Sequence, residues 1–193
     1  MVTFRQGINI INVLRYEKIL LFLSLIVAMV CKAQTKQELL PVGTMAPDFT
    51  VTDSVTGKKL FSLSESRTQV TADGKVKAGV WVVLDFWASW CPDCRKDMPT
   101  VKKIDEKYGK KIKLIGVSFD TDKAKMNGYL SANQYSWLQY SEFKKWKETQ
   151  ISKDYHISWI PTSYLIDPEG KIAFSTLNAE EMLEKLDSLE AEL

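Results

Sequence analysis

The stretch Trp81-Val-Val-Leu-Asp-Phe-Trp-Ala-Ser-Trp-Cys-Pro-Asp-Cys-Arg-Lys-Asp-Met-Pro99 decides the fold of this chain. Residues 80–87 are almost all apolar, with Asp85 as the single charge, which predicts a strand covered on both faces. A helix is expected to follow, with Cys91 and Cys94 in its first turn. Unpaired backbone N–H groups and the positive end of the helix dipole favour a thiolate there. The pattern therefore predicts thiol–disulfide exchange.

Two other uses of the cysteine pair fit the sequence less well. A structural zinc site needs four ligands, and the rest of the chain adds only Cys31 and a single histidine, His156. A structural disulfide that closes so short a loop would constrain the unfolded chain little. We therefore interpret Cys91 and Cys94 as reactive thiols.

Three motifs connect this stretch to a known family. They are Asp85-Phe-Trp-Ala-Ser-Trp-Cys-Pro-Asp-Cys-Arg95, Ile160-Pro161-Thr162 and Ala46-Pro47-Asp48-Phe49. Together they resemble the thioredoxin superfamily, and within it the extracytoplasmic thiol–disulfide reductases of the TlpA/ResA type. The resemblance covers residues 43–193. It implies an α/β thioredoxin-like fold with a central mixed β-sheet flanked by helices. An N-terminal β-hairpin extension is expected within the same range.

The resemblance also implies an enzyme, a protein-disulfide reductase, and assigns roles within it. Cys91, the more exposed cysteine in such proteins, is the expected nucleophile, and Cys94 is the resolving thiol. Their redox-active disulfide is the only redox group expected, with no separate cofactor and no metal. Asp85 is expected behind Cys94, where a buried carboxyl could take its proton, although a purely structural hydrogen-bonded role is the alternative.

Pro161 is expected by the same resemblance to be a cis proline that faces the cysteines. It would keep the backbone of Ile160 free to pair with an extended substrate. Trp90 and Trp159 are expected to flank the cysteines and to shape a surface where a client protein docks.

Two residues lie between the cysteines. Pro92 suits a position in the first helical turn, because its missing N–H would be unpaired there in any case. Asp93 places a carboxylate near the Cys91 sulfur, where it opposes the thiolate that the helix dipole favours. This balance predicts a reducing protein rather than a strong oxidant.

Three further residues carry weaker expectations. Asp97 matches a Glu that ResA-like proteins often have just after the motif. Gly116 stands on the neighbouring strand where thioredoxins often have a Lys. The lone His156 is expected at the surface or at a helix end.

The N-terminus has the pattern of an export signal. Basic residues precede the uncharged run 19–30, and Cys31 and Ala33 are small residues at the positions that a signal peptidase reads. A signal peptide is therefore expected over residues 1–33. A retained membrane anchor and a lipid attached to Cys31 are the alternatives, and each predicts a periplasmic or cell-envelope protein.

The remaining chain is expected to consist of a linker over residues 34–42 and one domain over residues 43–193. The full chain of 193 residues is 45% hydrophobic, which is enough for one packed core. Its formal net charge is +2, and residues 1–33 carry four basic residues and one acidic residue, so the remainder has a net charge of −1. No basic patch argues for nucleic acid.

The order of the expected elements follows from periodicity and from turn residues. Before the central strand we expect a hairpin about Gly57 over 50–63 and a loop or second hairpin over 64–79. After it we expect a helix from Cys91 to Tyr108, a strand over 112–119, a helix from Lys123 capped by Asp122, and a strand and an edge helix within 134–147. The chain should end with a short helix over 148–155, a hairpin of 162–166 with 171–175, and a last helix that begins with a capping box of Asn178 and Glu181.

Other function classes remain open at this stage. A peroxiredoxin-like peroxidase would explain the Ala-Pro-Asp-Phe stretch, but Ala88 stands where those enzymes place a Thr. A redox-inactive binding module or a copper chaperone is the non-enzyme alternative. Copper delivery usually recruits a histidine beside the thiols, and only His156 is available. The expected partners are an oxidised protein client and an upstream thiol electron donor. The protein is expected to be a monomer that meets a membrane only through its leader or a lipid.

Overall fold

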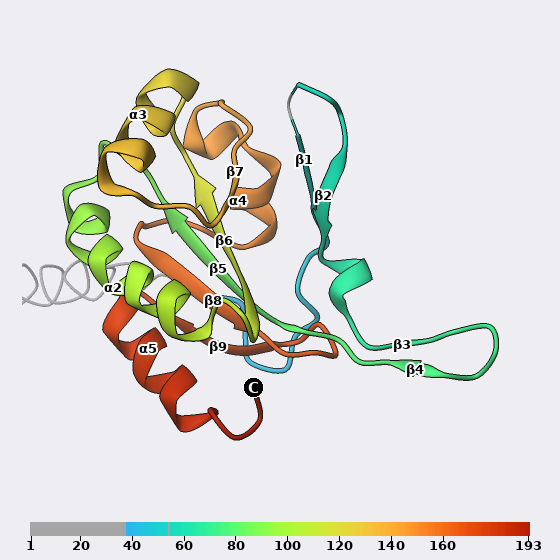
Figure 1. Ribbon diagram of the computed structural model, residues 1–193. Helices are drawn as coiled ribbons and strands as arrows, with labels where there is room; N and C mark the ends of the chain where they lie inside the picture. Colours follow the sequence, from blue (N-terminus) through green and yellow to red (C-terminus); the bar gives the residue numbers. More distant parts are fainter. Residues whose placement is uncertain (1–37, 54) are drawn as a thin grey trace, which may run out of the picture. The chain divides into compact units, whose positions relative to one another are not determined.

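Figure 1 shows a computed structural model of the chain, in which residues 38–53 and 55–193 are described. The expected signal peptide, with Cys31, and the first part of the expected linker lie outside the described residues. Leu40, within the expected linker, is buried, and its N–H donates a hydrogen bond of 3.1 Å to the Tyr164 hydroxyl. The chain is therefore packed against the domain by this point.

A mixed five-stranded β-sheet lies at the centre, in the order β7-β6-β5-β8-β9. Its strands are β5 (Trp81–Trp87), β6 (Ile112–Ser118), β7 (Leu138–Tyr140), β8 (Thr162–Ile166) and β9 (Ile172–Thr176). Strands β5, β6 and β7 are parallel, whereas β8 runs antiparallel to both β5 and β9. This arrangement confirms the expected thioredoxin-like α/β fold with a mixed sheet.

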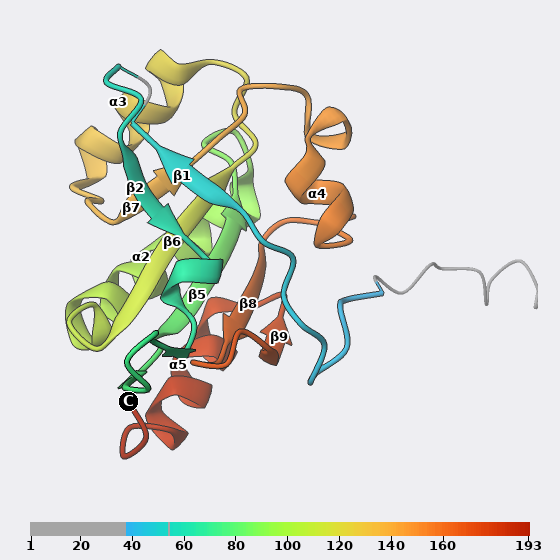
Figure 2. The ribbon, with the colours of Figure 1, turned by 90° about the vertical axis from the view of Figure 1, so that its right-hand side faces the viewer.

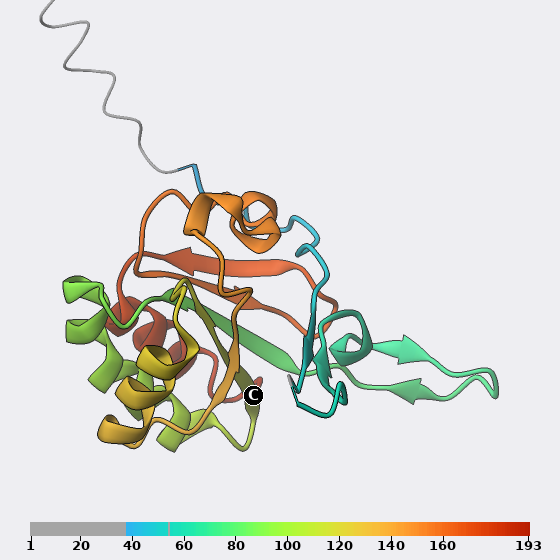
Figure 3. The same ribbon diagram turned by 90° about the horizontal axis from the view of Figure 1, so that it is seen from above.

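Helices cover both faces of this sheet. They are α2 (Pro92–Tyr108), α3 (Lys123–Asn133), α4 (Gln150–Asp154) and α5 (Ala179–Ser188). Helices α2, α3 and α5 lie on one face and α4 lies on the other (Figure 3). The expected stripes explain the packing, since Val101, Ile104 and Tyr108 of α2 and Met182 and Leu186 of α5 are all buried.

The central strand β5 is buried from Val82 to Trp87, as its apolar sequence predicts. Side chains alternate between the two faces of a strand. Phe86 packs against Phe119 and Tyr155 on the α4 side, while Trp87 packs against Tyr129 of α3 on the other side. The strand therefore ends in two large aromatic residues that are fixed on opposite faces, directly before the cysteine segment.

Two small hairpins precede the sheet. The first pairs β1 (Thr50–Thr52) with β2 (Lys59–Ser62), and Gly57 turns it with a φ of 68°, as expected. It lies on the same side of the sheet as α4 (Figure 2), where Phe49 contacts Tyr140 and Tyr155. This confirms the N-terminal hairpin extension.

The second hairpin pairs β3 (Gln69–Val70) with β4 (Val76–Lys77), within the segment expected to form a loop or second hairpin. It extends away from the rest of the domain (Figure 1). The short 3-10 helix η1 (Ser64–Ser66) joins the two hairpins.

The expected edge helix within 134–147 does not form as such. A short 3-10 helix, η2 (Trp146–Glu148), stands in its place. Trp146 stacks on Phe119 there and is held by tertiary packing.

Two helix starts differ in detail from the expectation. Cys91 is the N-cap of α2 and not its first residue, because its backbone is extended and the helix begins at Pro92. Asn178 caps α5 through the Glu180 N–H, but Glu181 does not complete a capping box. The Asn178 N–H already donates to the Thr176 hydroxyl, and Glu181 accepts a hydrogen bond from that same hydroxyl. Asp122 caps α3 as expected.

Candidate active site

The two cysteines lie at the N-terminus of α2, both as free thiols. Cys91 Sγ accepts a hydrogen bond of 3.2 Å from the Cys94 N–H, one of the backbone donors that a helix start leaves unpaired. Pro92 occupies the first helical position, where it has no N–H to leave unsatisfied. Cys91 is 5% exposed and Cys94 is 1% exposed. Cys91 is therefore the outer cysteine, in the order that the resemblance implies.

The peptide bond between Ile160 and Pro161 is cis, as the resemblance implies. The Cys91 thiol donates to the Ile160 carbonyl oxygen, with a distance of 3.7 Å between sulfur and oxygen. Both Ile160 and Pro161 are buried, and it is the backbone carbonyl of Ile160 that contacts the cysteine. The loop before β8 thus supplies an acceptor directly opposite the helix terminus.

Two tryptophans are exposed beside this contact. Trp90 directly precedes Cys91 in the chain and is 53% exposed, while Trp159 directly precedes Ile160 and is 56% exposed. Large exposed aromatic side chains are typical of sites that bind a partner. The exposure agrees with their expected place at the surface around Cys91.

Asp85 is buried in β5, with 3% of its surface exposed. Burial is the main reason that its pKa rises to about 7, a charge at Asp97 adds to the rise, and a hydrogen bond of 3.0 Å from the Ser163 hydroxyl opposes it. A charge on Asp85 in turn raises the pKa of the Cys94 thiol. The two groups are therefore electrostatically linked, as expected for an acid that lies behind Cys94.

Cys94 is held in its thiol form by its surroundings. Burial is the largest cause of its raised pKa, and its hydrogen bond with Cys91 is the next. A buried thiol of this kind needs a base to become a nucleophile. Because the pKa of Asp85 is raised to about 7, both its ionised and its protonated forms are populated at neutral pH.

Asp97 lies farther along α2 and links it to α5. Its carboxylate accepts a hydrogen bond of 3.1 Å from the Ala179 N–H at the start of α5. Partial burial is the main cause of its raised pKa. The structure thus places Asp97 at a helix junction and gives it an electrostatic influence on Asp85.

Asp93 is exposed, and sequence reasoning missed its partner. Its carboxylate forms an ion pair of 2.9 Å with Lys96, three residues further along the helix. Residues at this spacing lie on the same helix face, so the spacing was the available signal. The pair reduces the charge that Asp93 presents to Cys91.

Gly116 lies on β6 directly beside Asp85 of β5, at the neighbouring-strand position where thioredoxins often have a Lys. A Cβ atom at Gly116 would lie 2.3 Å from Oε1 of Gln139. That oxygen accepts a hydrogen bond of 3.0 Å from the indole N–H of Trp87. The glycine therefore leaves room for the Gln139 side chain to support Trp87, just before the cysteine segment.

Sequence reasoning also missed that Asp120, two residues after β6, is a buried acid. Its carboxylate accepts hydrogen bonds from Ser89, which precedes the cysteines, and from Ser118. Parallel strands β5 and β6 bring these residues to the same edge of the sheet, although Ser89 and Asp120 are 31 positions apart in sequence. A polar residue two positions after the end of each strand was the only signal.

His156 lies away from any helix start and follows α4. It is exposed, has a φ of 53°, and its N–H donates to the Lys153 carbonyl. This confirms the expected placement at the surface and at a helix end.

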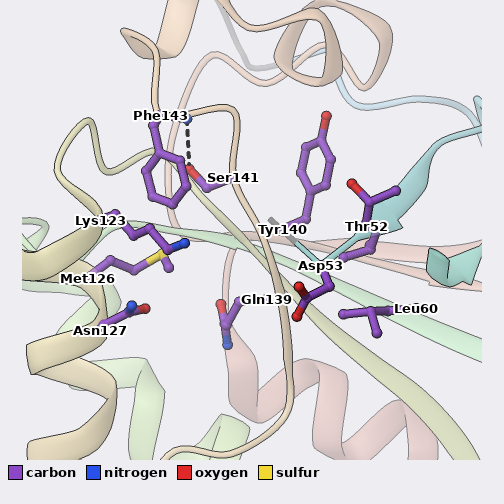
Figure 4. A pocket seen from close by; sticks show the side chains of 11 residues that line it. Thr52, Asp53, Leu60, Lys123, Met126, Asn127, Gln139, Tyr140, Ser141 and Phe143 are labelled. Atoms are coloured by element: carbon purple, nitrogen blue, oxygen red, sulfur yellow. Dashed lines mark hydrogen bonds between the residues drawn. The ribbon is translucent and has the colours of Figure 1, made fainter. Parts of the chain in front are cut away.

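A separate cavity of about 340 Å³ lies between the β1–β2 hairpin, α3 and β7 (Figure 4). Asp53, Asn127 and Gln139 line it together with Tyr140 and Phe143. None of the predicted site residues is among its lining residues. Two of its lining residues connect the cavity to the cysteine segment. Gln139 accepts a hydrogen bond from Trp87, and the Ser141 hydroxyl donates to the carbonyl of Asp120, whose carboxylate binds Ser89.

Within residues 38–53 and 55–193, no group of three His, Cys, Asp or Glu side chains could hold a metal ion. No helix in this part of the chain is long and apolar enough to cross a membrane.

Comparisons with known proteins agree with this geometry. A family model described as thioredoxin-like matches residues 79–172. A protein of *Bacillus subtilis* named thioredoxin-like protein YneN is 31% identical over 75% of this chain and 78% of its own length. The thiol-disulfide oxidoreductase ResA of *Bacillus thuringiensis* is 30% identical over 79% of each chain.

Solved structures of the same kind also resemble the domain. A thiol-disulfide oxidoreductase from *Bacteroides fragilis* is 28% identical with a TM-score of 0.61, over 76% of this chain and 99% of that one. The thioredoxin domain of a thiol-disulfide oxidoreductase from *Bacteroides vulgatus* is 26% identical with a TM-score of 0.61, over 78% of this chain and 98% of that one.

Proposed function

This chain belongs to the thioredoxin-like family, and from that premise we propose that it is an exported thiol–disulfide oxidoreductase that reduces protein disulfides through Cys91 and Cys94. The contact of Cys91 Sγ with two backbone groups carries the proposal. The sulfur lies 3.2 Å from the Cys94 N–H and 3.7 Å from the Ile160 carbonyl before a cis proline. A hydrogen bond from a helix N-terminus favours a thiolate, which is the reactive form of cysteine.

In the first step, the Cys91 thiolate attacks one sulfur of an oxidised client protein. The client disulfide bond breaks, a mixed disulfide forms between the client and Cys91, and the second client sulfur leaves as a thiolate that takes a proton from solvent. Cys91 is the attacking residue because it is the outer thiol and receives the helix N–H.

In the second step, Cys94 resolves the mixed disulfide. Asp85 takes the Cys94 proton, directly or through water, and the resulting thiolate attacks Cys91 Sγ. The bond between Cys91 and the client breaks, the Cys91–Cys94 disulfide forms, and the client leaves with two thiols. Two electrons have then passed to the client, and an upstream thiol donor restores the dithiol.

Trp90 and Trp159 supply the client-binding surface in this proposal. Both indoles are more than half exposed and adjoin residues whose sulfur and carbonyl are in contact. An extended client segment that lies between them could pair with the backbone at Ile160 while its disulfide reaches Cys91. Pro92 and Asp93 directly follow Cys91 in the chain and are exposed, so they belong to the same client-binding surface.

Export is proposed from the signal-peptide pattern of residues 1–33. It would place the thiols in the periplasm or cell envelope, where disulfides in client proteins persist. The expected monomer with an oxidised client and an upstream thiol donor belongs to the same proposal.

The direct test is a trapping experiment with Cys94→Ala protein in its native compartment. Without the resolving thiol, mixed disulfides between Cys91 and its clients should accumulate and be identifiable after acid quenching. Cys91→Ser is the matched control and should trap no client, since Cys94 is buried. Purified wild-type protein should also reduce insulin disulfides with dithiothreitol as donor. Failure of both measurements would refute the function.

A further inference from the structure

Asp120 is a buried carboxylate that lies between two strand ends. It lies two residues after the end of β6 and is 2% exposed. Its Oδ2 accepts hydrogen bonds from the Ser89 N–H at 2.9 Å and from the Ser118 hydroxyl at 2.7 Å, and its Oδ1 accepts one from the Ser89 hydroxyl at 2.6 Å. Its N–H donates to the Ser118 hydroxyl at 3.0 Å. Three donors on one buried carboxylate make a rigid support.

Ser89 has every polar group engaged. Its N–H and hydroxyl bind Asp120, and its carbonyl accepts a hydrogen bond of 2.6 Å from Nε of Arg95. The Arg95 guanidinium lies over the ring of Tyr129, 5.5 Å from its centroid. Ser89 is thus held by hydrogen bonds to the Asp120 carboxylate after β6 and to the Arg95 guanidinium on α2.

These hydrogen bonds fix the turn that carries Cys91, the proposed nucleophile. The Cys91 N–H donates a hydrogen bond of 3.1 Å to the Ala88 carbonyl, so residues 88–91 form a closed turn with Ser89 inside it. Cys91 Sγ at the end of this turn meets the Cys94 N–H at 3.2 Å. A displacement of Ser89 would therefore move the sulfur away from its donor.

We propose that Asp120 is a positioning residue for thiol–disulfide exchange, because its carboxylate fixes Ser89 and so holds Cys91 Sγ against the Cys94 N–H. The inference rests on the proposed role of Cys91 as the nucleophile. Asp120 does not touch the reacting sulfur itself, and it acts through the turn of residues 88–91.

Ser118 supplies the comparison that separates positioning from general stability. Ser89→Ala and Ser118→Ala each remove one buried hydroxyl that donates to the same carboxylate. Only Ser89 belongs to the turn that carries Cys91. Ser118→Ala also removes the acceptor of the Asp120 N–H, so it should destabilise the protein at least as much as Ser89→Ala. Only Ser89→Ala should nevertheless change the reactivity of Cys91.

The experiment measures the rate of Cys91 alkylation by iodoacetamide between pH 5 and 9, in a Cys94→Ala background that keeps the backbone donor. Asp120→Ala should slow the reaction at pH 7 about fivefold or more, the order expected for one lost hydrogen bond. Asp120→Asn should restore most of the rate, since its amide oxygen can accept from the Ser89 N–H and its NH₂ can donate to the Ser89 hydroxyl. Asp122→Ala is the matched control, because it removes the acid that caps α3 two residues away.

Urea unfolding of each variant shows whether it is folded, and the two serine variants decide the question if Asp120→Ala does not fold. A slower reaction for Ser89→Ala with an unchanged one for Ser118→Ala supports the inference. Equal slowing by these two, or by Asp120→Ala and Asp122→Ala, overturns it. Insulin reduction by the wild-type protein is measured in parallel, and its absence counts against the proposed function without changing how the alkylation rates are read.

Discussion

Asp85 and Ser163 face each other across β5 and β8, and the serine hydroxyl donates a hydrogen bond of 3.0 Å to Asp85 Oδ1. One hydroxyl replaces little of the water that an ionised carboxylate would have in solvent. Burial therefore dominates, and the pKa of Asp85 rises to about 7. On the other side of Asp85, β6 presents Gly116, which has no side chain to donate.

The first prediction is that the protein loses stability as pH rises from about 4 to about 7. In this range the unfolded chain has Asp85 ionised while the folded protein keeps it protonated, so the folded state binds more protons and unfolding becomes easier with rising pH. The difference between a pKa of 3.8 and one of about 7 corresponds to roughly 4 kcal/mol in the free energy of unfolding. Urea unfolding of reduced protein at several pH values measures this.

Asp85→Asn is the variant that isolates the effect, because its side-chain oxygen can still accept from Ser163 but cannot ionise. Its free energy of unfolding should depend much less on pH than that of the wild type. The free energy of unfolding of this variant should still fall with rising pH, but less steeply, since Asp97 and Asp105 also have pKa values raised chiefly by burial. If both proteins lost stability in parallel, Asp85 would not be the group responsible.

The second prediction concerns the kinetics of Asp85→Asn. Release of the client from the mixed disulfide should slow on the order of a hundredfold, the scale of a lost general base, while the initial attack by Cys91 changes little. In the wild type, release should accelerate as pH rises through about 7, because Asp85 becomes able to accept a proton. Stopped-flow tryptophan fluorescence separates the two steps. Equal slowing of both would reduce Asp85 to a structural residue.

Much of the fold was predictable because its signals are local. The apolar run before Cys91 predicted β5, Gly57 predicted the first hairpin, and Asp122 predicted the start of α3. The capping box at Asn178 was wrong because its donor is satisfied by Thr176, which precedes the helix at the end of β9. Local pattern gives the cap position but not which of several nearby polar groups will meet.

The candidate site was predictable only where family motifs or helix spacing carry it. The motifs predicted that Cys91 and Cys94 lie at the start of a helix, that Asp85 is buried and that the bond before Pro161 is cis. The contact between Ser89 and Asp120 depends instead on the register of two parallel strands, which no short stretch of sequence encodes. The ion pair of Asp93 with Lys96 has the correct helical spacing, but spacing alone does not say whether a side chain turns toward its neighbour.

The third prediction concerns the exposed tryptophans. Trp90→Ala and Trp159→Ala should each raise the KM for a protein client roughly tenfold, the scale of one aromatic anchor at an interface, with little change in kcat. Reduction of a small aromatic disulfide should be nearly unaffected, since it needs no extended docking. Val55→Ala, at a residue 88% exposed on the turn between β1 and β2, is the control and should behave as wild type. A fall in kcat with unchanged KM would argue against a docking role.

The fourth prediction concerns residues 1–33. A fusion of residues 1–40 to a reporter should be exported, and the protein recovered from cells should begin at or near Gln34. N-terminal sequencing or intact mass measures the cleavage point. A lipid on Cys31 would show instead as a mass increase and a start at that residue, and an uncleaved chain in the cytoplasm would contradict the export proposal.

The last prediction is the reduction potential, which depends on the charges around Cys91. The helix N-terminus favours its thiolate and Asp93 opposes it, but the ion pair of 2.9 Å between Asp93 and Lys96 weakens that opposition. The thiolate therefore receives modest stabilisation, and a dithiol without strong stabilisation gives up its electrons readily. The potential should lie nearer the roughly −270 mV of thioredoxin than the roughly −120 mV of DsbA.

Equilibration with glutathione or dithiothreitol, followed by trapping of thiols, measures the potential, and a value above about −160 mV would contradict a reductase. Asp93→His should raise the potential, because an imidazolium favours the thiolate that the carboxylate opposes. Lys96→Ala should lower it, since the uncompensated Asp93 charge then acts on Cys91 alone. The two variants change opposite charges near the same sulfur, so their potentials should move in opposite directions. If both potentials moved in the same direction, the charges of Asp93 and Lys96 would not be what sets the potential.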